Sequence, residues 1–220
     1  MFRTLGCLVL IIFSVLLISC KSNFVIDVYS SDLFLKDNID TPALMEFEIP
    51  SCSSDRREKF DRDVLAIFDS TSKAKIVGCE KSNLKVSISS EITSTVSSRD
   101  VILIRNVVDD RKIEGLEYEG IGLSPIISGP FIQRIKSLLD ENWQKLSYKQ
   151  IKIQVSLHND EKEDVFVSSE NLWVDGIPYQ RYENQRLKRR EKISLFFSDV
   201  MSDLVIRGAN PIAFHLYKLK

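Results

Sequence analysis

Few residues of this chain have the types and spacing that an active site requires. The two histidines are His158, in a turn beside Asn159 and Asp160, and His215, in an apolar run near the C-terminus. A serine hydrolase needs one histidine within reach of both a serine and a carboxylate. Neither histidine has neighbours in the sequence that indicate such a set. We therefore expect no catalytic residues and no enzymatic activity.

The sequence gives no clear signal for a metal site or a cofactor site either. The pair Asp109–Asp110 and the run 160–164 could offer carboxylate oxygens to Ca²⁺, but neither has the spacing of a known calcium loop. Two histidines and no Cys-x-x-Cys argue against zinc. The chain also has no phosphate-binding loop, nucleophile elbow or dinucleotide fingerprint. We expect solvated turns at both acidic segments and no cofactor.

The most unusual charged segment is the basic stretch 181–192. Its six cations are opposed by Glu183 and Glu191, whereas the whole chain has 30 basic and 31 acidic residues. That balance argues against a nucleic-acid partner, which needs a surplus of cations. The cations are Arg181, Arg186, Lys188, Arg189, Arg190 and Lys192.

Two interpretations of the basic stretch stay open. It is either a solvated hairpin loop or an exposed loop that contacts an anionic partner. That partner would be phospholipid headgroups, lipopolysaccharide phosphates or an acidic envelope protein. Each Lys or Arg beside an anionic membrane surface contributes about 1 kcal/mol. We predict the second interpretation.

The N-terminus is typical of an export signal. Arg3 precedes an apolar run from Leu5 to Ile18, which is shorter than the roughly 20 residues that a membrane-spanning helix needs. The run ends in Leu17-Ile18-Ser19-Cys20 and resembles the lipobox of bacterial lipoproteins. The resemblance implies cleavage before Cys20, a diacylglycerol on its sulfur and acylation of the new amino group. The alternatives are an uncleaved signal anchor and a secreted protein cut elsewhere.

The same resemblance bears on location. In enterobacteria-like sorting, an Asp after the lipidated cysteine retains a lipoprotein in the inner membrane, and this chain has Lys21 instead. The expectation is a bacterial outer-membrane lipoprotein that faces the periplasm.

Cys52 and Cys79 are the thiols that remain after removal of Cys7 and lipidation of Cys20. Thiols in an oxidising envelope compartment usually pair, and a bridge here would close a loop of about 28 residues. The alternatives are a redox pair and two free buried thiols.

The elements that would position these residues are short strands and two helices. One helix is predicted after Asp55, with Phe60 and Val64 on its apolar face, and another after Gly129-Pro130. Alternating runs predict strands on both sides of the second helix. We expect an α+β fold with two amphipathic helices packed on antiparallel β and a β-sandwich-like C-terminal half. The expected parts are the signal 1–19, an α+β part 20–149 and a β-rich part 150–220. The last two form either one domain or two.

Several segments resemble a family of uncharacterised small lipoproteins with a domain of unknown function, found in bacteria and prophages. The segments are Glu48–Cys52 (EIPSC), Ala74–Cys79 (AKIVGC), Ile153–Asp160 and Trp173–Pro178, whereas Asn184–Lys192 departs from the pattern. The resemblance implies no known activity, but it favours the lipid anchor and the Cys52–Cys79 pairing.

These features favour a lipid-anchored envelope protein that binds another envelope component, and that alters the host surface if a phage encodes it. The alternatives are a carrier of an apolar ligand in a cavity of the β-rich half and an envelope hydrolase.

Overall fold

The computed structural model describes residues 22–35, 38–49, 51–53, 57–142, 151–209 and 211–220. Within these residues, eleven strands form one mixed sheet. The strands are β1 (Ser22–Tyr29), β2 (Ile39–Glu48), β3 (Lys75–Glu80), β4 (Asn83–Thr93), β5 (Val101–Ile113), β6 (Leu116–Ile127), β7 (Ile151–His158), β8 (Val165–Val174), β9 (Ile177–Leu187), β10 (Lys192–Phe197) and β11 (Phe214–Leu219).

The helices of the described residues are fewer than the strands. They are α2 (Ser30–Phe34), α3 (Arg57–Ala66), α4 (Gly129–Asn142), α5 (Asp199–Ile206) and a 3-10 turn, η1 (Ser70–Ser72). None of these helices has the length and apolarity needed to cross a membrane.

The predicted α+β class is wrong, because strands dominate the fold and join one mixed sheet. The two predicted helices are present as α3 and α4. However, the segment 109–125, which lacks a continuous apolar run and gives no clear strand signal, belongs to the long β5–β6 hairpin. The outer parts of that hairpin are exposed, so burial does not impose an apolar pattern on them. The C-terminal strands likewise pair with N-terminal ones and do not form a separate sandwich.

The sheet runs in the order β10-β7-β1-β2-β4-β5-β6-β11-β8-β9, and β3 pairs with β4 beside this path. β1 lies between β2, which is antiparallel to it, and β7, which is parallel to it with Ser22 opposite Ile151 and Tyr29 opposite His158. β10 pairs with β7 and also with β8, where Leu195 lies opposite Val174. The path of paired strands therefore returns to its starting strand.

One large apolar cluster fills the interior. β1 alternates between buried and half-buried residues, as a strand with one face in the core must. Phe24 packs edge-on against Phe131 of α4, and Phe131 also contacts Phe68 after α3. The helices are therefore held by the same core as the strands.

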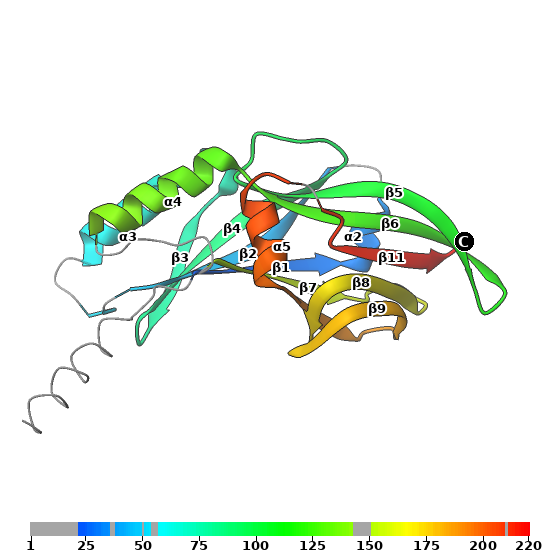
Figure 1. Cartoon of the computed structure of the whole chain (residues 1–220). Coiled ribbons are helices and arrows are strands. Elements are labelled where there is room, and N and C mark those ends of the chain that lie inside the picture. Colours follow the sequence, from blue (N-terminus) through cyan, green and yellow to red (C-terminus); the bar gives the residue numbers. More distant parts are fainter. Residues whose placement is uncertain (1–21, 36–37, 50, 54–56, 143–150, 210) are drawn as a thin grey trace, which may run out of the picture.

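The molecule has two distinct ends (Figure 1). At the helix end lie α3, α4 and the start of β1, because Ser22 pairs with Phe47 near the end of β2, which leads into the α3 segment. At the loop end lie α2, the segment His158–Asp164, the turn Lys188–Glu191 and the C-terminus. β1 points from the helix end to the loop end.

Candidate functional site

The basic stretch lies at and beside the loop end. Arg181 and Arg186 belong to β9, Lys188–Arg190 form the turn that follows, and Lys192 begins β10. The expectation of a loop over 181–192 is therefore wrong for 181–187, which continue the antiparallel pairing with β8. β9 is exposed over most of its length, which is why its polar composition gave no strand signal.

Four of the six cations make ion pairs within the chain. The nitrogen–oxygen distances are 2.7 Å for Arg181–Glu183, 2.5 Å for Arg186–Asp164, 4.0 Å for Lys188–Glu191 and 3.8 Å for Lys192–Asp27. Within the described part of the chain, the side chains of Arg189 and Arg190 have no ion pair, and both residues are exposed. The unbalanced positive charge of the stretch is therefore concentrated on two adjacent guanidinium groups.

Backbone hydrogen bonds fix the turn that carries these two arginines. The amide of Arg190 donates to the carbonyl of Asn159 at 2.7 Å, and the amide of Asn159 donates to the carbonyl of Glu191 at 2.9 Å. The amide of Arg189 donates to Asp164 Oδ1 at 3.1 Å. Burial alone would raise the pKa of Asp164, but hydrogen bonds from Arg186 and Arg189 outweigh it and lower that pKa. Asp164 is thus held as a carboxylate at neutral pH.

Asn159 is buried beneath the turn and joins several segments. Its Nδ2 donates to the carbonyls of Glu163 and Leu187, both at 2.9 Å. Its Oδ1 accepts from Ser30 Oγ at 3.1 Å and from the amide of Glu161 at 3.0 Å. This buried side chain ties α2, the β7–β8 loop and β9 together, directly before the run 160–164 for which the sequence predicted only a solvated turn.

Asp160 completes the attachment of α2. It accepts the amide of Ser31 at 2.9 Å, the hydroxyl of Ser31 at 2.6 Å and the hydroxyl of Ser30 at 3.0 Å. Burial opposes ionisation of Asp160, but these hydrogen bonds dominate and lower its pKa. The pKa of Asp32 is raised by burial and by the charge of Asp160.

Among the described residues, no group of His, Cys, Asp or Glu is placed to hold a metal ion.

The histidines do not assemble a hydrolase site among the described residues. His158 contacts Asp27 at 3.3 Å and stacks on Tyr29 with ring centres 4.9 Å apart. His215 Nδ1 lies 3.1 Å from the hydroxyl of Tyr217, and burial together with Arg111 lowers the pKa of this histidine.

A surface hollow of about 230 Å³ lies beside His215. Ser168 lines it, but the Ser168 hydroxyl interacts with Asn184. Other residues of the hollow include Arg111, Glu170, Arg181 and Glu183. Four of its lining residues are charged, whereas a site for an apolar ligand is lined mostly by apolar side chains.

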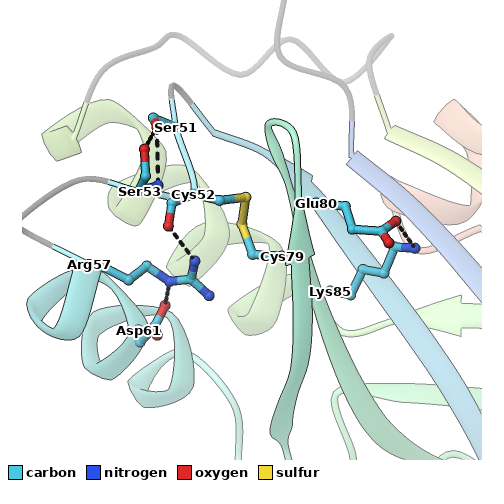
Figure 2. The surroundings of a disulfide bond; sticks show 8 residues. All are labelled: Ser51, Cys52, Ser53, Arg57, Asp61, Cys79, Glu80 and Lys85. Atoms are coloured by element: carbon cyan, nitrogen blue, oxygen red, sulfur yellow. Dashed lines mark hydrogen bonds and ion pairs between the residues drawn. A yellow bond between two sulfur atoms is a disulfide. The ribbon is translucent and has the colours of Figure 1, made fainter.

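Cys52 and Cys79 form a disulfide with Cα atoms 5.7 Å apart, as predicted (Figure 2). It fastens the segment before α3 to β3. Arg57 extends this attachment, since its Nη1 donates to the Cys52 carbonyl at 3.1 Å and its Nε pairs with Asp61 at 2.5 Å. Cys20, the predicted lipidation site, lies outside the described residues.

Comparison with known families gives one match. A family model described as "Domain of unknown function (DUF7424)" matches residues 22–218. Neither the curated proteins nor the solved structures give a significant match. The match begins two positions after Cys20, so it covers the folded body and does not include the lipobox-like segment.

Proposed function

Since the chain belongs to the DUF7424 family, whose function is unknown, we propose that it is a lipid-anchored envelope protein that acts by binding another envelope protein. The anchor is the acylated Cys20, and the membrane is the outer membrane on its periplasmic side. Binding, and not catalysis, is its role.

The position of Ser22 carries this proposal. Ser22 is 1% exposed and already belongs to β1, paired with Phe47 on one side and Ile151 on the other. The described fold therefore reaches to within two residues of Cys20, where a lipoprotein's mature chain would begin. Each buried methylene of an acyl chain contributes about 0.8 kcal/mol, so two or three chains would hold this body at a membrane surface permanently.

The disulfide supports an envelope location. Stable disulfides persist in oxidising compartments such as the bacterial periplasm and are rare in the cytosol. Cys52 and Cys79 pair in the fold, and an exported chain would meet the conditions that form this bridge.

The loop end supports binding. Arg189 and Arg190 are exposed on a turn whose backbone is held by Asn159 and Asp164. A preorganised surface binds with less loss of conformational entropy than a mobile one.

The apolar carrier remains the second candidate function and the hydrolase the third, but the charged hollow beside His215 favours neither of them.

Lipidation is tested by mass spectrometry of the membrane fraction. We expect a mature chain that starts at Cys20 and carries acyl chains. The variant Cys20→Ser should lack the acyl chains and leave the membrane fraction, because its anchor is gone. Cys7→Ser is the matched control, since Cys7 lies within the cleaved signal, and this variant should be acylated like the wild type. Acylation of Cys20→Ser would refute the anchor.

A further inference from the structure

We infer that the loop end faces away from the membrane that holds the anchor, and that Arg189 and Arg190 there bind an acidic patch on a partner protein. This inference rests on the proposed anchor at Cys20. It assigns an orientation and a partner chemistry that the anchor alone does not give.

The start of β1 must lie close to the membrane that holds the anchor. A chain spans at most about 3.6 Å per residue, and Lys21 is the single residue between Cys20 and Ser22. The start of β1 is therefore within about 7 Å of the lipidated residue. α5 begins close by, because Lys152 forms an ion pair with Asp199 and lies opposite Asn23 of β1. Val200, the next residue, is 71% exposed at this end.

The basic turn lies at the other end of the same strands. β1 and β7 run parallel from Ser22 and Ile151 to Tyr29 and His158, and seven steps of about 3.3 Å make roughly 23 Å. Lys192 lies opposite His158, and Arg190 is hydrogen-bonded to Asn159, one residue further. The two free arginines are thus about 23 Å along the strands from the anchored end.

At that distance, the leaflet that holds the anchor cannot be the partner of the two arginines when the strands stand perpendicular to the membrane. The Debye length at physiological ionic strength is about 8 Å, so headgroup charges about 23 Å away are screened almost completely. Tilting would bring the turn closer, but two cations gain only about 1 kcal/mol each beside an anionic membrane. The carboxylates of Asp164 and Glu191 next to the turn would be repelled by the same surface.

The mixed charge of the loop end favours a protein over a uniform polyanion. Carboxylates already neutralise Arg186, Lys188 and Lys192 there. A layer of phosphates would meet those carboxylates along with the arginines. A folded partner can instead place single carboxylates opposite Arg189 and Arg190, which bind them through paired N–H groups.

Orientation is measured on the full acylated protein in phosphatidylethanolamine–phosphatidylglycerol vesicles. A fluorophore is attached to one introduced cysteine, either Arg189→Cys or Val200→Cys, while the native disulfide stays oxidised. Headgroup nitroxide lipids should quench the label at 200 strongly and leave the label at 189 largely unquenched. Equal quenching of both would overturn the orientation. If the chain carries no acyl group and neither label is quenched, it is the proposed anchor that has failed.

The partner is tested in cells with a photo-crosslinking residue at position 188. We expect a protein adduct that the double variant Arg189→Glu/Arg190→Glu reduces at least tenfold. Arg181→Glu is the control, because Arg181 is already paired with Glu183, and it should leave the adduct unchanged. A lipid adduct, no adduct, or a protein adduct that survives the double reversal would each overturn the acidic-partner assignment.

Discussion

Asn159 shows how one buried amide can organise a whole end of the molecule. It is 1% exposed and satisfies two backbone carbonyls, those of Glu163 and Leu187. Its oxygen accepts from Ser30, which lies 129 residues away in sequence. The Asn159 backbone is hydrogen-bonded to the turn with Arg189 and Arg190, and its side chain holds Leu187, which directly precedes that turn.

Replacing Asn159 by Ala should lower the free energy of unfolding by about 2–4 kcal/mol, since each buried carbonyl left without a donor costs about 1–3 kcal/mol. Urea denaturation followed by circular dichroism measures the change. Asn83→Ala is the control, because Asn83 is exposed at the start of β4, and it should shift the free energy by less than about 0.5 kcal/mol. A loss below about 1 kcal/mol in Asn159→Ala would show that water replaces the lost donors.

The sequence could predict the types of these residues but not their partners. The acidic run 160–164 and the basic stretch 181–192 are each prominent, yet they look like two separate solvated segments. In the fold they meet, because Asp164 binds both Arg186 and the amide of Arg189. The β8–β9 hairpin brings them together. Its Asp175-Gly176 turn sets the register near the turn, but a bulge between Val167 and Ser169 shifts the pairing further along, and the exposed β9 carries no strand pattern.

At the scale of elements, the sequence predicts the helices and strands that bury one face, because burial requires an apolar pattern on that face. α3 and α4 show helical spacing because one face of each enters the core. The outer half of the β5–β6 hairpin and most of β9 are exposed, so their sequences carry no such pattern. The disulfide was predictable for another reason: the proposed export and lipidation would leave only two thiols to pair.

The disulfide should stabilise the α3 region and with it the whole fold. The residues are separated by 27 positions, and closing such a loop contributes about 3.6 kcal/mol in the chain-entropy model. We expect Cys52→Ser/Cys79→Ser to lower the unfolding free energy by about 2–4 kcal/mol. Urea titration of wild type and variant measures this difference. Equal midpoints and slopes would mean that the Arg57–Asp61 and core contacts alone hold this segment.

At the scale of the whole molecule, strands that are far apart in the sequence pair as neighbours in the sheet. β7 inserts beside β1, and β11 inserts between β6 and β8. The predicted boundary near residue 150 follows a change in sequence pattern, and the strands on its two sides, β1–β6 and β7–β11, are joined into one sheet by the pairs β1–β7 and β6–β11. A pattern along the chain cannot reveal such pairing, because the contacts join residues more than 100 positions apart.

This topology predicts that residues 22–142 do not fold without the rest of the chain. In that fragment β1 would lose β7, and β6 would lose β11, so both strands would expose open edges. The core residues Phe24 and Leu123, both buried at 0% exposure, would lose their cross-strand neighbours Ile153 and Phe214. Exposed edges of this kind promote aggregation.

We therefore expect the fragment to show no cooperative urea transition, whereas residues 22–220 unfold in a single transition. Co-expression with residues 151–220 should restore the transition, because β7 and β11 can then pair as they do in the intact chain. A fragment 22–142 that is monomeric and unfolds cooperatively on its own would show that the N-terminal strands form a stable core without β7. In that case the sheet would consist of two units joined after folding, and the buried pairing of Ser22 with Ile151 would form last.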